Sequence, residues 1–264
     1  MRKEKKKDIL VGILLIIILI LSGVLLFLVL TKEEKTEKKT IENKVTEQKE
    51  DFSNISSTLL NIIDNYKIDI LDLYGTDIVI STIPTNEQLN AMKYSLSQNG
   101  TSEIPSIPKS IVDDYFKTVY NVTPSQYPDI ICKVDNKTIY SYDKDKQEYV
   151  TANEHSHNEY LIEALSKTVT NIIKENNTYI VDVAKIYEGN IEDASIGQFY
   201  SDGTYKNVLK DYEQFFDGEN YDETGAINYF NNNKDKAKNF KPQYRYTFKK
   251  TGDNYYITKY QVIK

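Results

Sequence analysis

The stretch Lys167–Tyr187, KTVTNIIKENNTYIVDVAKIY, decides the fold. Two runs rich in β-branched and aromatic residues flank Glu175-Asn176-Asn177, and such a polar triplet is typical of a turn between strands. Side chains two apart in a strand point the same way. In the second run the residues that share one face are Tyr179, Val181 and Val183. The stretch therefore predicts an antiparallel hairpin.

In two more segments the side chains alternate between apolar and polar with a period of two residues, as in a β-strand. Upstream, residues 130–134 and 138–142 alternate about a turn at Asp135-Asn136, and a short third strand is expected at residues 148–150. Near the C-terminus, residues 243–249 and 254–262 flank a turn at residues 250–253. The three hairpins together predict an antiparallel sheet.

Helical spacing of apolar residues marks three segments before the hairpins, at residues 52–66, 85–96 and 111–119. Thr85 and Gln88 form a capping-box pattern at the start of the second. A later helix is predicted from Tyr205 to Phe216, followed by a polar loop at residues 217–225. Helices with hairpins imply an α+β fold in which helices pack on one face of an antiparallel sheet.

The N-terminus has the pattern of a membrane anchor. Residues 1–8 form a basic tail, and the 22 residues Ile9–Leu30 carry no charge. A helix of that length crosses a hydrocarbon core of about 30 Å. A cleaved signal peptide has a shorter apolar stretch and a small-residue cleavage site, and neither is present here. Positive charge resists translocation, so we expect a single-pass protein of the cell membrane with its N-terminus in the cytoplasm.

The remaining chain divides into a charged stalk, residues 31–51, and an extracellular domain, residues 52–264. The stalk is too polar to bury itself. The whole chain has a net charge of −6 and the first 31 residues carry +3, so the exported part carries −9. Such a charge disfavours nucleic-acid binding. Cys132 has no cysteine partner for a disulfide and is expected to be a core residue.

The order of basic tail, span, stalk, early helices and hairpins resembles uncharacterised single-span exported proteins of AT-rich Firmicutes and Mollicutes. Two segments carry this resemblance, YPDIICKVDNKTIYSYDKDKQEYV at residues 127–150 and RYTFKKTGDNYYITKY at residues 245–260. It implies a membrane-anchored extracellular protein and no particular activity. The architecture is also similar to the membrane-anchored NTF2-like domains of conjugation machinery, in which helices precede a curved antiparallel sheet.

Two histidines raise the question of a metal site. In NEHSHNEY, residues 153–160, an extended backbone would project His155, His157 and Glu159 from one face, and two imidazoles with a carboxylate suit zinc or another divalent metal. Asn153, Ser156 and Asn158 favour a solvated loop instead. The sequence leaves both interpretations open, so no cofactor is required and a divalent metal is the only one it suggests.

Tyrosine is unusually frequent, with 22 residues against 9 phenylalanines. Aromatic side chains with a polar tip suit binding surfaces. Alternating tyrosines of the C-terminal hairpin are candidates for a ligand or partner surface: Tyr244, Tyr246, Tyr256 and Tyr260. Burial of one sheet face under helices would place them in the core instead.

These observations favour a non-enzymatic, membrane-anchored extracytoplasmic domain that binds a protein or a cell-surface ligand, as part of a cell-envelope assembly. The alternative is a surface hydrolase, metal-dependent through His155 and His157. No sequence motif of a nucleotide-binding loop, nucleophile elbow or zinc protease decides for an enzyme.

Overall fold

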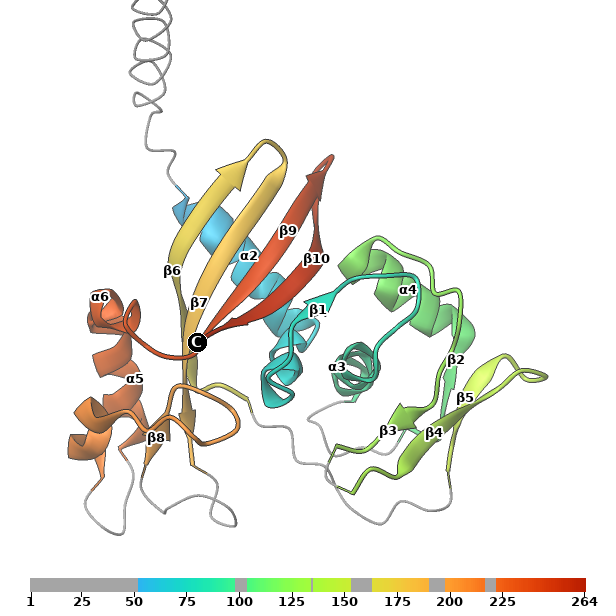
Figure 1. The fold of residues 1–264 in the computed structure, drawn as a ribbon, viewed down its shortest axis with the longest axis horizontal. Helices are drawn as coiled ribbons and strands as arrows, with labels where there is room; N and C mark the ends of the chain where they lie inside the picture. The colour runs from blue at the N-terminus through green and yellow to red at the C-terminus, as the bar shows by residue number, and fades with distance from the viewer. Residues whose placement is uncertain (1–51, 98–103, 134, 153–162, 190–197, 217–221) are drawn as a thin grey trace, which may run out of the picture. The chain divides into compact units, whose positions relative to one another are not determined.

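Helices and antiparallel sheets form the described part of the chain, so the predicted α+β class is confirmed (Figure 1). The computed structural model describes residues 52–97, 104–133, 135–152, 163–189, 198–216 and 222–264. Phe52–Lys264 forms one compact unit. No helix within the described ranges has the length and apolar character needed to cross a bilayer. The predicted span and stalk lie outside these ranges.

The larger sheet joins the hairpin predicted at residues 167–187 to the C-terminal hairpin. Its strand order is β1-β10-β9-β7-β6, and β8 pairs with β7. The strands are β1 (Ile78–Val79), β6 (Ser166–Glu175), β7 (Thr178–Glu188), β8 (Phe199–Tyr200), β9 (Gln243–Thr251) and β10 (Asn254–Ile263). All pairs are antiparallel, and Val181 of β7 lies opposite Tyr246 of β9. Both predicted hairpins are thus confirmed, and they form one sheet.

A second sheet of four strands has the order β2-β5-β4-β3. Its strands are β2 (Ser106–Pro108), β3 (Ile130–Ile131), β4 (Thr138–Asp143) and β5 (Glu148–Thr151). β3 is shorter than the predicted strand at residues 130–134. The reason is that the turn already closes at Cys132, whose N–H donates to the carbonyl of Lys137 and whose carbonyl accepts from Asn136.

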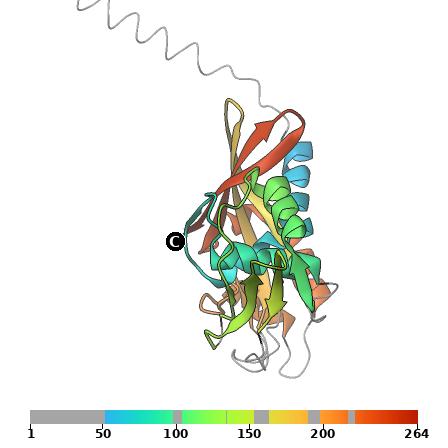
Figure 2. The same cartoon turned by 90° about the vertical axis from the view of Figure 1, so that its right-hand side faces the viewer.

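Helices α3 and α4 connect the two sheets (Figures 1 and 2). The helices of this layer are α2 (Ser53–Asn65), the 3₁₀ helix η1 (Ile68–Leu73), α3 (Asn86–Leu96) and α4 (Lys109–Tyr120). α4 contacts β10 and β2, whereas α3 contacts η1 and β3. The capping box of α3 is confirmed, because the Thr85 and Gln88 side chains each accept a hydrogen bond from the other residue's backbone N–H. All three predicted early helices are present.

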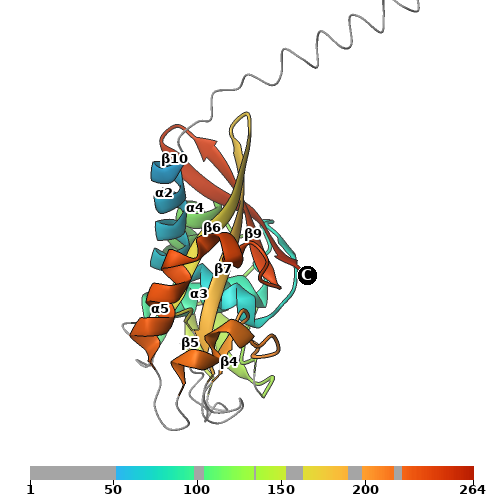
Figure 3. The same cartoon turned by 90° about the vertical axis from the view of Figure 1, so that its left-hand side faces the viewer.

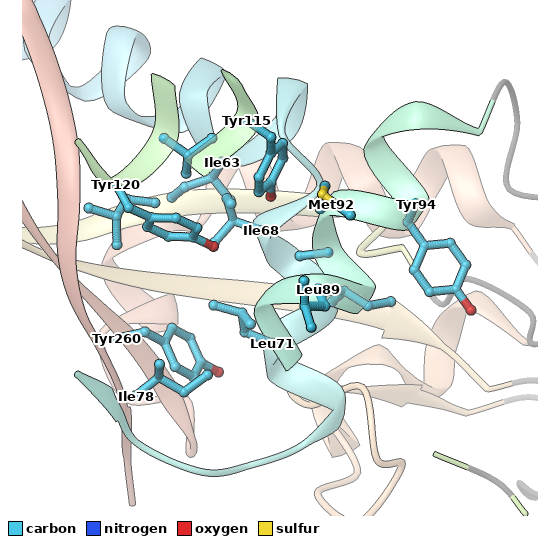
Figure 4. Packing of buried hydrophobic residues seen from close by; sticks show 14 of the residues in the cluster. Ile63, Ile68, Leu71, Ile78, Leu89, Met92, Tyr94, Tyr115, Tyr120 and Tyr260 are labelled. Carbon is cyan, nitrogen blue, oxygen red and sulfur yellow. The ribbon is translucent and has the colours of Figure 1, made fainter. Parts of the chain in front are cut away.

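One hydrophobic core runs through this layer and reaches both sheets. Figure 4 shows Leu89 of α3 close to Leu71 of η1, and Tyr260 of β10 beside Ile78 of β1. Phe116 of α4 is fully buried in the same core. Since a single core spans both sheets, the described unit is one lobe rather than two.

The larger sheet also has helices on its other face, which differs from the predicted one-sided packing. Ala184 and Ile186 of β7 belong to a second core with Phe230, whereas Val181 and Val183 belong to the first. The elements on this side are η3 (Lys210–Phe215), α5 (Glu223–Asn232) and α6 (Lys234–Ala237). Figure 3 shows α5 and α6 near β6, which both contact. β7 is therefore buried on both faces.

The helix predicted from Tyr205 to Phe216 is wrong in its first half. Tyr205 has a φ of 56°, which a right-handed helix excludes. Asp202 instead accepts hydrogen bonds from the backbone N–H groups of Thr204, Lys206 and Asn207, so the segment folds into a loop. The loop predicted at residues 217–225 is also too long, because Asp222 caps α5 by accepting from Gly225 N–H at 2.8 Å.

An asparagine from α3 completes the pairing of β3. The Asn86 side chain accepts from Ile131 N–H at 2.8 Å and donates to Ile131 O at 3.0 Å. Asn90 donates to the same carbonyl at 3.1 Å. Asn86 thus provides the two hydrogen bonds that a neighbouring strand would provide, and it joins α3 to the second sheet.

We predict that Asn86→Ala destabilises the protein by about 1–3 kcal/mol, because the Ile131 N–H loses its acceptor in a partly buried position. Asn61→Ala is the matched control, since Asn61 is exposed on α2, and its effect is expected to stay within about 0.5 kcal/mol. Urea denaturation measures both. Equal effects of the two substitutions would contradict the strand-like role of Asn86.

Candidate functional site

The predicted metal ligands His155, His157 and Glu159 lie outside the described residues, which stop at Ala152 and resume at Glu163. Within the described ranges no group of three or more histidine, cysteine, aspartate or glutamate side chains is arranged to hold a metal ion. The metal site therefore stays a prediction. Cys132 is buried, with 1% of its surface exposed, as expected of a core residue.

The tyrosines of the C-terminal hairpin do not form a common surface. Tyr244, Tyr246 and Tyr260 are buried and belong to the core, whereas Tyr256 is half-buried. A β-bulge between Ile257 and Lys259 is the reason for the difference. One extra residue shifts the alternation of β10, so that Ile257 and Tyr260 point inward and Tyr256 points to the other face. The burial of three of the four corrects the interpretation as a ligand surface.

Three of these tyrosines surround a buried charge cluster that the sequence analysis did not predict. Lys185 of β7 is completely buried, and its Nζ donates to Asp69, to Asp72 Oδ2 at 2.5 Å and to the Tyr246 hydroxyl at 2.8 Å. Both aspartates come from η1. Its ammonium also lies 4.8 Å from the centre of the Tyr244 ring. The cluster joins η1 to the centre of the larger sheet.

Asp72 receives further hydrogen bonds from tyrosine hydroxyls. Tyr187 donates to its Oδ2 at 2.6 Å, and Tyr260 donates to its Oδ1 at 2.8 Å. At the edge of the cluster, Lys167 of β6 binds Asp69 and also Asp64 of α2. We call Asp69, Asp72, Lys167, Lys185 and the attached tyrosines the Lys185 cluster.

Burial and pairing shift the pKa values within the Lys185 cluster in different directions. Burial raises the pKa of Asp72, and the nearby Lys185 offsets this only in part. For Asp69, burial also favours the neutral acid, but Lys185 and Lys167 together hold its pKa below the usual value. Burial opposes the charge of Lys185, yet the two aspartates outweigh it and raise its pKa. Lys185 therefore stays an ammonium ion at neutral pH.

The Lys185 cluster is closed to a ligand. Asp72 is 1% exposed and Lys185 is 0% exposed, so neither side chain offers a free face to solvent. Their donors and acceptors are used within the cluster. We conclude that the cluster fixes the position of η1 on the sheet rather than meeting a substrate.

An open cavity lies on the opposite face of the same sheet. Its volume is about 450 Å³. The lining residues on which its chemistry depends are Asn171, Asp182, Lys238, Lys241, Gln243 and Arg245, and we call it the Arg245 cavity. Asp182 of β7 and Arg245 of β9 lie opposite each other in the paired strands. The cavity therefore rests on two paired interior strands of the sheet.

Arg245 is held in one orientation by a two-point ion pair. Its Nε donates to Asp182 Oδ1 at 2.6 Å and its Nη2 donates to Asp182 Oδ2 at 2.9 Å. Asn171 donates to Asp182 Oδ2 at 3.1 Å. The pKa of Asp182 is lowered, because the hydrogen bonds from Arg245 and Asn171 outweigh the opposing effect of burial. Both partners of the pair are thus charged at neutral pH.

A second cavity, of about 500 Å³, lies where α2, η1 and the start of β6 meet. Its charges are already paired with one another. Lys67 binds Glu163 at 2.5 Å, and Lys167 binds Asp64 and Asp69. Its lining thus has less unpaired charge to offer a ligand than the Arg245 cavity has.

The sequence contained signals for both sets of charges. Lys185 interrupts the apolar face Tyr179, Val181, Val183, which is unusual for a buried strand. Arg245 is one of only two arginines in a chain with 31 lysines. Neither signal identifies a partner, because the carboxylates that bind these residues lie far away in the sequence.

Comparison with protein families, curated proteins and solved structures finds no match to this chain.

Proposed function

We propose that this protein is a membrane-anchored, extracytoplasmic binding domain of the cell envelope, with a protein or a cell-surface ligand as its partner and no catalytic role. The uncharged run Ile9–Leu30 behind a basic tail supports the anchor and the orientation. The Arg245 cavity supports the binding role, and it is the observation that carries the proposal.

The Arg245 cavity has the properties of a binding site. Its volume falls in the range of about 300–1,000 Å³ in which small-molecule sites lie. Its central arginine is fixed in advance by Asp182, so little conformational freedom is lost when a ligand binds. The other large charge cluster of the described residues is sealed and stabilises the fold, which leaves this cavity as the best supported binding surface.

The topology is tested by adding protease to intact cells. We expect the domain at residues 52–264 to be digested while a cytoplasmic marker protein stays intact. Protection of the domain in intact cells, with digestion only after lysis, would show that it faces the cytoplasm and would contradict the proposal.

The binding role is tested with a photo-crosslinking residue placed at position 238, at the Arg245 cavity, in intact cells. We expect an adduct of higher mass that is absent when the same residue replaces Lys117, which is exposed on α4 away from the cavity. Identical crosslinking patterns from the two positions would contradict a binding role for the cavity.

A further inference from the structure

The unused hydrogen-bond donors of Arg245 indicate what the cavity binds. A guanidinium group has five N–H donors, and Asp182 accepts from only two of its nitrogens, Nε and Nη2. Both N–H groups of Nη1 and one of Nη2 make no hydrogen bond to a described residue. One N–H of Nη1 and the remaining N–H of Nη2 form the end-on pair of the guanidinium fork, which suits two oxygens of one oxyanion. The side chain is 35% exposed, so solvent reaches it.

Two lysines add positive charge to the same cavity. Within the described residues, Lys241 is exposed and its ammonium has no hydrogen bond or ion pair. Lys238 binds Asp235 at 2.9 Å, but the Asp235 side chain is 96% exposed, and such surface pairs contribute little. Among the described residues that line the cavity, Asp182 is the only acidic one, so three positive charges face one negative charge.

Asp182 cancels only one of these three positive charges, so an incoming anion meets a net positive charge. Asp182 is buried, with its side chain 9% exposed, and both of its oxygens accept hydrogen bonds from Arg245, with one also accepting from Asn171. Its role is to orient the guanidinium fork. An anion that approaches from solvent meets Arg245, Lys238 and Lys241.

We propose that the Arg245 cavity binds a phosphate group, an inference that deepens the proposed binding function and rests on it. Inorganic phosphate or a phosphate monoester has three or more terminal oxygens, which fit a two-point arginine contact together with separate lysine contacts. A carboxylate has only two oxygens and one charge, and the arginine fork alone would satisfy it. The cavity volume of about 450 Å³ also accommodates the organic group of a phosphate ester.

An arginine is required here for this purpose. Lysines outnumber arginines 31 to 2, and a lysine at position 245 would provide a charge but no planar fork. It could not bind Asp182 through two nitrogens and an oxyanion through others at the same time. Arg245→Lys therefore removes the geometry and retains the charge.

The test is isothermal titration calorimetry of the full-length protein in lipid nanodiscs with inorganic phosphate, glycerol 3-phosphate and poly(glycerol phosphate). We expect saturable binding of at least one probe, weakened roughly tenfold or more by Arg245→Lys, because charge-assisted hydrogen bonds are lost. Lys241→Ala should weaken it several-fold. Lys249→Ala is the matched control and should leave it unchanged, since Lys249 lies on the same strand and outside the cavity.

Each outcome decides the proposal. Tightest binding of glycerol 3-phosphate supports a phosphate monoester. Tightest binding of the polymer, whose phosphodiesters have only two terminal oxygens each, supports a wall polymer with neighbouring phosphates on Arg245 and on the lysines. Three results would overturn the proposal: no saturable binding of any probe up to about 10 mM, equal binding of acetate, or unchanged binding in both cavity variants. Lys241 is exposed, so Lys241→Ala remains informative if Arg245→Lys unfolds. A failure here would leave the crosslinking result valid, because a partner could dock at the cavity without a phosphate.

Discussion

Lys185→Ala is expected to destabilise the protein by about 3–5 kcal/mol, which is the largest effect we predict for a single substitution. The substitution removes the ammonium that balances Asp72, and no other lysine or arginine is paired with that carboxylate among the described residues. Asp69 keeps Lys167 as a partner, so the loss falls mainly on Asp72. Denaturant unfolding at neutral pH measures the change.

The pH dependence distinguishes this mechanism from a simple loss of packing. Burial already raises the pKa of Asp72, and removing Lys185 raises it further. A carboxyl group with a raised folded-state pKa stabilises the protein when protonated and loses that contribution as the pH rises through the folded-state value. The difference in unfolding free energy between Lys185→Ala and the parent protein should therefore become smaller as the pH falls. A difference that is independent of pH would contradict an unbalanced Asp72.

The matched control for this prediction is Lys67→Ala. Lys67 is also paired with a carboxylate, Glu163, but both side chains are partly exposed, at 36% and 54%. Surface pairs contribute about 0–1 kcal/mol, so we expect a change in that range. The comparison isolates the effect of burial, since both substitutions remove one lysine from an ion pair.

Asp72→Ala is the second large prediction, with an expected loss of about 2–5 kcal/mol. The hydroxyls of Tyr187 and Tyr260 lose their acceptor inside the core, and Lys185 keeps only Asp69 as an ionic partner. The same unfolding measurement applies. Tyr260→Phe is a useful comparison, because it removes one of these hydrogen bonds and leaves all the charges in place.

Removing both charges should destabilise the protein by less than the sum of the losses of the two single substitutions. In the double variant Lys185→Met, Asp72→Leu, the remaining pair Lys167 and Asp69 is neutral overall. Replacing a buried ion pair by apolar residues is often close to neutral for stability. We expect the double-mutant cycle, with Lys185→Met and Asp72→Leu as its single variants, to give a coupling energy of at least about 3 kcal/mol, because each single variant leaves a buried charge unpaired. Additive effects would show that Lys185 and Asp72 act independently.

The two charge sites on opposite faces of β7 have different consequences. Lys185 and Asp182 belong to the same strand, three residues apart, and so point to opposite faces. Lys185 is sealed by η1 and the tyrosines, whereas Asp182 faces the open Arg245 cavity. Coverage by helices, not residue type, therefore separates the charges that hold the fold from those available to a ligand.

The sequence by itself determined the local elements, and it is the basis for the proposed membrane topology. Alternation of apolar and polar residues identified the hairpins, and helical spacing with the Thr85–Gln88 capping box identified α2, α3 and α4. These signals depend on neighbours within a few residues, so a single sequence is enough to find them. Local signals failed at the β10 bulge, where one extra residue reverses which side chains of the strand face the core. They also failed at Asp202, which closes a loop instead of starting a helix.

Only the tertiary structure decided which charges meet. Asp72 lies 113 residues from Lys185 and Asp182 lies 63 residues from Arg245, so no local pattern links them. Sheet order brings β7 beside β9, and the packing of η1 then encloses one set of charges, while the Arg245 cavity leaves the other set open to solvent. The physical reason is that burial and pairing depend on how elements stack, and that is set by the whole core rather than by any one segment.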